Sequence, residues 1–206
     1  MKKALTIDNI LNKKYDLFEF TDAWEEAFGR PERKGVWFVW GGSGNGKTRF
    51  TMQLAKYLAG FDRVLYNSLE EGSSHTVRKA FEDVGMSEVS GRLLLVSESI
   101  LKLNERLKKQ RRASIIIIDS FQYCQINYKQ YLAFKEKHKD KLIIFISHAD
   151  GKQPAGRAAR SVMYDASLKI WVEGFRAFSK GRYIGEKGNY TIWESGAQEY
   201  WRDDEM

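Results

Sequence analysis

The stretch that decides the fold is residues 41–48, which read Gly41-Gly42-Ser43-Gly44-Asn45-Gly46-Lys47-Thr48. It has the spacing G-x-x-x-x-G-K-T of a Walker A loop, which binds a nucleotide's phosphate chain. Glycines adopt backbone conformations that side chains forbid, so successive N–H groups can point at one anion. In such loops the lysine reaches the β- and γ-phosphates and the hydroxyl contacts Mg²⁺. We therefore expect these residues and the adjoining Arg49 to bind a nucleotide, with Thr48 also at the metal.

The sequence on both sides of this loop predicts a strand before it and a helix after it. Residues 36–40 are continuously apolar, as is typical of a buried strand. After the loop, apolar residues with i, i+4, i+7 and i+8 spacing form one helix face: Phe50, Leu54, Tyr57 and Leu58. This order aims the helix N-terminus at the phosphates. A glycine-rich turn that matched the pattern by chance would not need either neighbour.

The composition favours one domain with its own core in a reducing compartment. The chain has 206 residues, 43% of them hydrophobic and 14% aromatic. Cys124 is the one cysteine, so no internal disulfide is possible. No segment approaches the roughly 20 apolar residues that cross a bilayer. The first residues also lack the apolar core of a secretory signal. We expect a cytoplasmic protein with no membrane partner.

The formal net charge of +7 makes a polyanion such as nucleic acid a reasonable partner. The densest basic run lies on a helix predicted over residues 99–111 and comprises Lys102, Arg106, Lys108, Lys109, Arg111 and Arg112. A solvated helix face explains this run equally well. The charge alone therefore does not establish DNA binding.

Strands and helices alternate along most of the chain. Strands are expected at residues 36–40, 63–68, 92–96, 114–119 and 141–147, and helices after the loop and at 73–84, 99–111 and 128–138. This order predicts a mainly parallel α/β sheet with helices on both faces. Later strands at residues 168–172, 174–182 and 190–194 suggest an antiparallel extension at one sheet edge. Residues 1–34 are expected to form an N-terminal segment with a short helix, and residues 35–206 the main domain.

Two groups of acids follow predicted strands. Four isoleucines precede Asp119, which is the pattern of a Walker B strand whose acid completes the Mg²⁺ site. Such an acid emerges at the carboxyl end of the strand, where open α/β sheets bind ligands. Glu70 and Glu71 follow the strand at 63–68, close to where a γ-phosphate would lie. The alternative for Asp119 is an acid that simply ends a strand. The alternative for Glu70 and Glu71 is a surface turn with two solvated acids.

Ser68-Leu69-Glu70, after a strand and before a helix, resembles the catalytic-glutamate segment of RecA-like ATPases, especially the DnaB-type helicases. The Glu70-Glu71 pair is also similar to the Sms/RadA and KaiC branches. The resemblance implies a RecA-like fold that uses ATP and Mg²⁺, with Glu70 polarising the attacking water and Glu71 as the other candidate. Ser120 stands where AAA+ ATPases carry a glutamate after the Walker B acid, which counts against that group.

Residues 142–172 resemble the sensor strand and second DNA-facing loop of RecA-like proteins. The resemblance makes His148 the γ-phosphate sensor. It also implies that Lys152, Arg157 and Arg160, in a flexible basic loop over residues 151–160, contact single-stranded DNA. A satisfied core histidine and a loop that only closes the fold are the alternatives.

The spacing of Lys180 and Arg182 resembles the DnaB-type segment that enters a neighbouring subunit's nucleotide site. An arginine there stabilises charge on the transferring phosphoryl group. The resemblance therefore implies a homo-oligomer, either a hexameric ring or a filament. A basic β-turn would contain the same residues.

These expectations together favour a Mg²⁺-dependent RecA-like ATPase that acts with DNA in replication, recombination or repair. The short chain fits a phage or mobile-element protein. One alternative is an ATP-dependent binding module or loader with little turnover. The other is a small-molecule kinase with a basic lid at residues 151–160.

Overall fold

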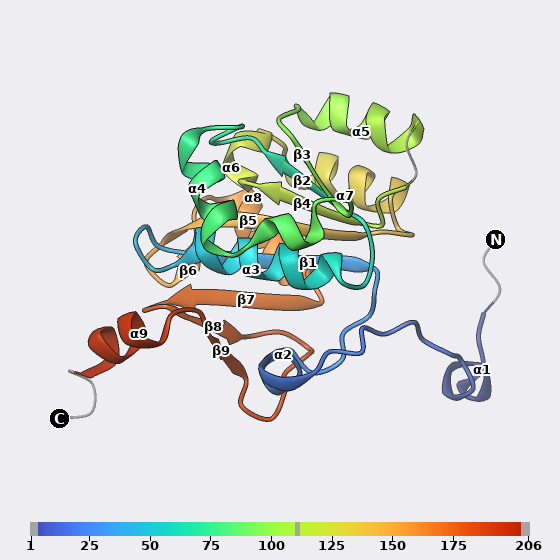
Figure 1. Cartoon of the computed structure of the whole chain (residues 1–206). Helices are drawn as coiled ribbons and strands as arrows, with labels where there is room; N and C mark the ends of the chain where they lie inside the picture. The colour runs from blue at the N-terminus through green and yellow to red at the C-terminus, as the bar shows by residue number, and fades with distance from the viewer. Residues whose placement is uncertain (1–3, 110–111, 203–206) are drawn as a thin grey trace.

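The computed structural model describes residues 4–109 and 112–202, which build one twisted sheet with helices on both sides (Figure 1). Within these residues the sheet is nine-stranded. Its strands in spatial order are β3 (Leu93–Val96), β2 (Val64–Ser68), β4 (Ile115–Asp119), β5 (Leu142–Asp150), β1 (Gly35–Gly41), β7 (Leu168–Glu173), β8 (Arg176–Ser179) and β9 (Asn189–Thr191), with β6 (Gln153–Pro154) paired to β5. The helices are α1 (Ile7–Leu11), α2 (Asp22–Phe28), α3 (Lys47–Ala59), α4 (His75–Asp83), α5 (Ile100–Lys109), α6 (Phe121–Cys124), α7 (Tyr128–Lys137), α8 (Arg157–Asp165) and α9 (Glu194–Trp201), with a 3₁₀ turn at Met86–Val89.

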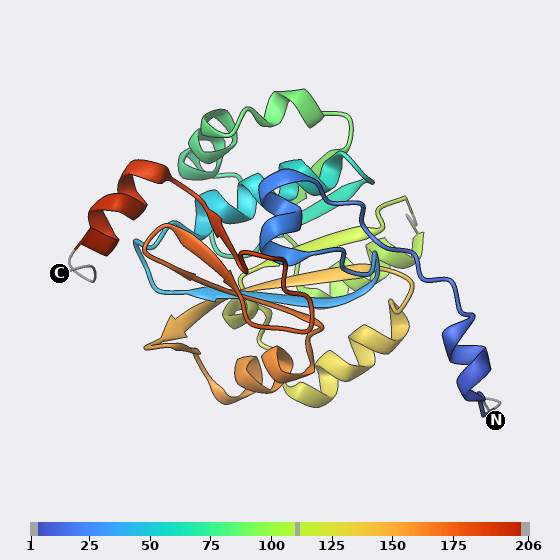
Figure 2. The same ribbon diagram turned by 90° about the horizontal axis from the view of Figure 1, so that it is seen from below.

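The six strands from β3 to β7 are parallel. Their apolar runs are continuous because both faces of the sheet are covered. Trp37 and Ile117 face the side of α2 and α3, whereas Phe38 and Ile118 face the side of α5 to α8. Figure 2 shows the sheet between these two helical layers. The predicted α/β fold with a parallel sheet is confirmed.

The antiparallel extension is also present, because β8 and β9 run against their neighbours beyond β7. The strand predicted at residues 190–194 is too long, however. β9 ends at Thr191, and α9 begins at Glu194. Gly196 lies against the rings of Trp193 and Phe175, so the small residues after the strand pack as a helix turn instead of continuing the sheet edge.

The prediction of a flexible loop over residues 151–160 is wrong. β5 and β6 form a short hairpin there, and α8 begins at Arg157. Ala159, Val162 and Met163 are buried, and this spacing along one helix face draws the segment onto the sheet. The basic helix predicted over residues 99–111 is observed as α5, and Arg111 lies outside the described residues.

The N-terminal segment contributes to the main core. Phe18, Phe20 and Trp24 are buried in the same cluster as Trp37 of β1. By contrast, α1 stands apart from the sheet in both views, joined by residues 12–16 (Figures 1 and 2). In the part of the chain that the structure describes, no helix has the length and apolarity needed to span a membrane.

Gly41, the first glycine of the loop, is required by strand packing. It lies at the end of β1 between His148 of β5 and Val172 of β7. A Cβ at this position would lie 2.4 Å from the backbone oxygen of Val172. We expect Gly41→Ala to lower the free energy of unfolding by about 1–3 kcal/mol, because the sheet must move apart. Urea denaturation measures this, and Gly91→Ala is the control because a Cβ there meets no atom within 4 Å.

Candidate functional site

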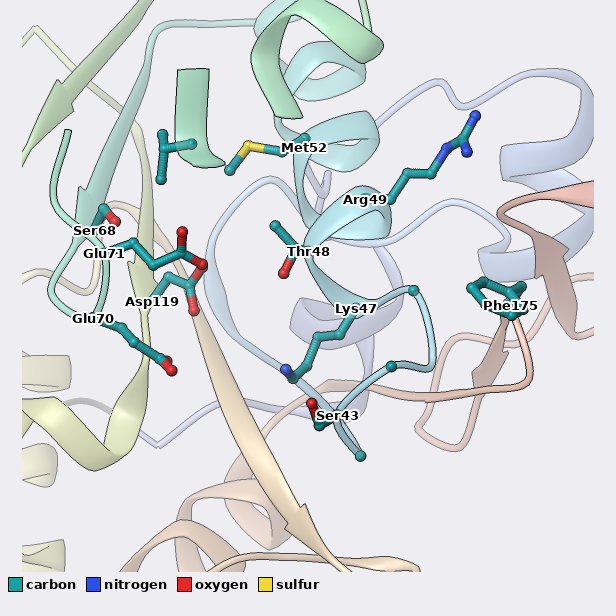
Figure 3. Close-up of a pocket in the computed structure, with 14 residues that line it drawn as sticks. Ser43, Lys47, Thr48, Arg49, Met52, Ser68, Glu70, Glu71, Asp119 and Phe175 are labelled. Carbon is teal, nitrogen blue, oxygen red and sulfur yellow. The ribbon is translucent and has the colours of Figure 1, made fainter. Parts of the chain in front are cut away.

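A pocket of about 390 Å³ opens at the carboxyl ends of β1, β2 and β4. It is lined by Gly42, Ser43, Gly44, Gly46, Lys47, Thr48, Arg49, Met52, Ser68, Glu70, Glu71, Val77, Asp119 and Phe175. Figure 3 shows Lys47 and Thr48 on one side and the three carboxylates on the other. The pocket therefore combines a phosphate-binding loop with the acids expected from the sequence.

The backbone of the loop has the conformation that its glycines allow. Gly44 and Gly46 have φ of 78° and 88°, in the left-handed region that side chains disfavour. Gly46 also caps α3, which begins at Lys47. The free N–H groups of this first helical turn point to the pocket, and the helix dipole adds positive potential there. The site is thus suited to an anion.

A tight turn between β7 and β8 supports the loop from the other side. Asn45 accepts a hydrogen bond from the backbone N–H of Gly174 at 2.8 Å, and its carbonyl accepts one from Phe175. The Phe175 ring lies at the pocket and meets the ring of Trp193 edge-on at 5.0 Å. The Arg49 guanidinium lies 5.9 Å from the Trp193 ring centre. Phe175 and Trp193 were not predicted from the sequence, because it is the fold that brings them beside the loop.

Asp119 lies at the end of β4, facing Lys47. The hydroxyl of Tyr66, a fully buried β2 residue, donates to Asp119 Oδ2 at 2.5 Å. Burial raises the pKa of Asp119, whereas the Tyr66 hydrogen bond and the Lys47 ammonium act to lower it. Burial and the Asp119 charge hold the pKa of Tyr66 well above its usual value, so Tyr66 remains a donor. Tyr66 was not anticipated from the sequence.

Glu70 is positioned by β4 and β5. Ser68 pairs with Asp119 across the strands, and the Asp119 carbonyl accepts hydrogen bonds from the N–H groups of Leu69 at 2.6 Å and Glu70 at 3.3 Å. The Glu70 carboxylate then meets His148 Nε2 at 2.8 Å. The structure therefore joins Glu70 and His148, two residues that the sequence indicates only separately.

The two neighbouring glutamates differ in their partners. Glu71 accepts hydrogen bonds from the hydroxyls of Ser74 and Thr76 at the start of α4. Those contacts hold Glu71 at the entrance to the helix. Glu70 instead pairs with a side chain from the end of β5. The two carboxylates are therefore held by different elements, Glu71 by the start of α4 and Glu70 by the end of β5.

His148 is itself held in place. Its backbone N–H donates to Gln122 Oε1 at 3.2 Å, and its Nε2 lies 3.4 Å from Ser120 Oγ. Gln122 also donates to Ser147 Oγ and to the carbonyl of Ala155. This network supports the end of β5, where the His148 ring lies beside Glu70.

The oxygen donors at the pocket fit a Mg²⁺ ion that arrives with a nucleotide. The Thr48 hydroxyl and the Asp119 carboxylate lie on opposite sides of the same space (Figure 3). Proteins usually hold Mg²⁺ through one or two carboxylates, waters and substrate phosphates rather than in a full protein cage. No group of three or more His, Cys, Asp and Glu that could hold a metal occurs within residues 4–109 and 112–202. The donor set therefore suits a metal shared with phosphates.

Lys180 and Arg182 do not line this pocket. The Arg182 N–H donates to the Ser167 carbonyl, and the Ser167 N–H donates to Val36 at the start of β1. The phosphate loop begins at the other end of β1, after Gly41, about 16 Å away at the usual rise per strand residue. The Arg182 side chain is too short to span that distance to the phosphate loop of its own chain.

Lys152, Arg157 and Arg160 are exposed near the β5–β6 hairpin and the start of α8. None of them lines the pocket. The Lys152 ammonium lies 5.9 Å from the centre of the Trp171 ring, and its carbonyl accepts a hydrogen bond from Trp40. These cations form a surface distinct from the phosphate site.

The chain resembles solved structures in fold, although it matches no protein-family model and no curated protein. The flagellar accessory protein FlaH from Methanocaldococcus jannaschii is 17% identical at a TM-score of 0.61, over 86% of this chain and 92% of that one. The KaiC-like protein PH0186 from Pyrococcus horikoshii OT3 is 18% identical at a TM-score of 0.56, over 78% of this chain and 89% of that one.

A third structure, the ATP synthase subunit NeqB from Nanoarcheaum equitans, is 8% identical at a TM-score of 0.59, over 90% of this chain and 58% of that one. At these identities the likeness concerns the fold. Together with the parallel sheet and the loop at the end of β1, it shows that the chain has a RecA-like P-loop fold.

Proposed function

We propose that this protein binds ATP with Mg²⁺ and hydrolyses it. The observation that carries the proposal is the placement of Glu70 opposite Lys47 across the pocket, with Glu70 held by His148 and by the backbone of Asp119 (Figure 3). A phosphate-binding loop alone retains a nucleotide. A fixed carboxylate facing it adds a group that can take a proton from water.

Each residue of the pocket has a separate role in this proposal. The loop N–H groups and Lys47 bind the β- and γ-phosphates, and Arg49 with Phe175 borders the nucleotide. Glu70 accepts the proton of the attacking water, and His148 registers the γ-phosphate through its contact with Glu70. Thr48 and Asp119 would hold Mg²⁺, which neutralises charge on the β- and γ-oxygens when bound.

Arg182, with Lys180 beside it, is proposed to serve the pocket of a neighbouring copy, because it is too far from its own. That role requires a homo-oligomer, either a hexamer or a filament. The basic residues Lys152, Arg157 and Arg160 are proposed to contact single-stranded DNA. We place this activity in the cytoplasm, in DNA replication, recombination or repair. Within the RecA-like ATPases, we propose that the chain is related to the KaiC, Sms/RadA and DnaB-type branches.

One observation favours a second candidate function, an ATP-dependent binding module with little turnover. No arginine other than the exposed Arg49 lines the pocket among the described residues, and P-loop hydrolysis without a catalytic arginine is slow. The kinase alternative gains no support, because the basic segment at residues 151–160 forms a hairpin and helix away from the pocket.

Steady-state phosphate release tests the proposal. The wild-type protein is expected to release phosphate from ATP only when Mg²⁺ is present, and faster with single-stranded DNA. Lys47→Ala is the matched blank, because it removes the ammonium that binds the phosphates. A wild-type rate equal to that of Lys47→Ala, with and without DNA, would favour the binding module.

Tyr66→Phe tests the support of the metal-site acid. Losing the hydrogen bond to Asp119 is expected to raise the Mg²⁺ concentration for half-maximal hydrolysis by about tenfold, because partners of metal-binding groups typically contribute 10–100-fold in affinity. Tyr131→Phe is the control, since Tyr131 is equally buried and bonds Asp165 away from the pocket. An unchanged Mg²⁺ requirement in Tyr66→Phe would show that Tyr66 only supports folding.

A further inference from the structure

β7 and β8 lie low in the sheet in Figure 1, below β1 and β5. Two aromatic rings of these strands and one of α9 contact one another, and the first of them, Trp171, also packs against the buried cluster on the side of α5 to α8. We call Trp171, Phe178 and Trp201 the aromatic strip. The centres of Trp171 and Phe178 are 5.5 Å apart, and those of Phe178 and Trp201 are 5.9 Å apart. Trp171 and Phe178 face each other in the strand register, so the sheet itself sets this spacing.

The strip is partly exposed, in contrast with the other face of the same strands. Ile170, Val172 and Ala177 point into the core and are fully buried. Trp171 and Phe178 alternate with them and remain half-buried. Adjacent large rings that remain partly in water form an apolar patch, and such patches mark interaction sites when they are contiguous.

Cations accompany each ring. The Lys180 ammonium lies 5.5 Å from the Trp171 ring centre and 5.8 Å from that of Phe178, and Lys152 lies 5.9 Å from Trp171. At the other end, Arg176 lies 5.7 Å from Trp201. Glu173 is the one acidic residue of β7 and β8. The occupant should therefore carry both negative charge and flat apolar groups.

We propose that the aromatic strip is a stacking platform for single-stranded DNA, whose unpaired bases lie on the rings while its phosphates meet Lys152, Lys180 and Arg176. Proteins that bind single strands combine a cationic track with aromatic side chains in this way. A duplex keeps its bases stacked on one another and could use only the cations. This inference rests on the proposal that the chain acts with DNA, and it extends the basic segment containing Lys152 into a defined surface.

The test compares aromatic and aliphatic side chains of similar apolarity. Trp171→Leu and Phe178→Leu keep the strand covered but remove the rings, and Trp171→Phe restores a ring. Binding of a labelled oligo(dT) is measured by fluorescence anisotropy at fixed salt. Each leucine variant is expected to bind at least about fivefold more weakly, which corresponds to about 1 kcal/mol per stacked base. Trp171→Phe should stay close to wild type.

Tyr15→Leu is the matched control, because Tyr15 is an exposed ring with the Lys13 ammonium 4.8 Å from its centre, away from the strip. Its affinity for oligo(dT) should be unchanged. Quenching of tryptophan fluorescence by oligo(dT) gives a second readout that does not depend on a folded leucine variant. The quenching should be smaller in Trp171→Phe than in wild type.

Four results would overturn the assignment: no binding of oligo(dT) by wild type, unchanged binding by the Trp171→Leu, Phe178→Leu double variant, equal affinity for duplex DNA, or a changed oligomer mass in the leucine variants. The last would make the strip a contact between copies. ATP hydrolysis is measured on the same samples. Failure of the strip with hydrolysis intact leaves the ATPase proposal standing, whereas loss of wild-type hydrolysis refutes that proposal separately.

Discussion

Glu70→Gln is expected to lower kcat for ATP hydrolysis by about 10²–10⁴-fold, the range for losing a general base. Glutamine keeps the size and the hydrogen bond with His148 Nε2, which is 2.8 Å from Glu70 in the structure. It cannot accept the proton of the attacking water. ATP binding should therefore stay close to wild type, as measured with a fluorescent ATP analogue, while phosphate release falls.

Glu71→Gln is the control for this prediction. Glu71 lines the same pocket, but its carboxylate is engaged by Ser74 and Thr76 at the start of α4. Its loss should change the rate far less than the loss of Glu70. A larger fall in Glu71→Gln than in Glu70→Gln would exchange the roles of the two residues.

Arg182→Ala is expected to lower hydrolysis by about 10³-fold or more, as for other arginines that stabilise the transferring phosphoryl group. Arg182 lies near the start of β1, whereas the phosphate loop follows the end of β1. The loss of hydrolysis would therefore occur in the pocket of a neighbouring copy. Mixing Arg182→Ala with Lys47→Ala should then restore part of the activity, since each copy supplies what the other lacks.

The matched control is Arg78→Ala, which removes an exposed arginine that pairs with Glu82 on α4. It should hydrolyse ATP at the wild-type rate. Mass measurement with an ATP analogue and single-stranded DNA accompanies the mixing experiment. Full activity in Arg182→Ala, or a strict monomer under all conditions, would contradict a role in trans.

The parallel core could be predicted because its strands are continuous apolar runs in the sequence. Residues 115–118 are four isoleucines, which only a strand buried on both faces accommodates comfortably. The carboxyl ends of adjacent parallel strands meet at one edge, so Asp119 and Glu70 were expected near the loop. The hydrogen bond from the Glu70 N–H to the Asp119 carbonyl follows from the pairing of β2 with β4.

The parts that the sequence did not predict depend on long-range contacts or on mixed local signals. Gly151, Pro154 and Gly156 are typical of a loop. The buried residues that indicate a helix, Ala159 and Val162, come only after them. Asn45 and Gly174 are 129 residues apart in sequence yet share a hydrogen bond. No local pattern indicates that this turn, with Phe175, would return to the phosphate loop.

Tyr66 illustrates the same limit within a strand that was predicted. Its position in β2 is evident from the apolar pattern, but the direction of its hydroxyl depends on where Asp119 lies in β4. A tyrosine in a buried strand needs a hydrogen-bond partner. That rule predicts a hydrogen-bond partner for Tyr66 but does not identify it as Asp119.

Above all, we propose that this pocket binds ATP between Lys47 and Glu70 and hydrolyses it. The most direct measurement is the identity of the nucleotide that the protein retains after incubation with ATP and Mg²⁺ and rapid desalting. We expect ADP with released phosphate for wild type, intact ATP for Glu70→Gln, and no nucleotide for Lys47→Ala. ADP formed by Glu70→Gln at the wild-type rate, or nucleotide retained equally by Lys47→Ala, would contradict the proposal.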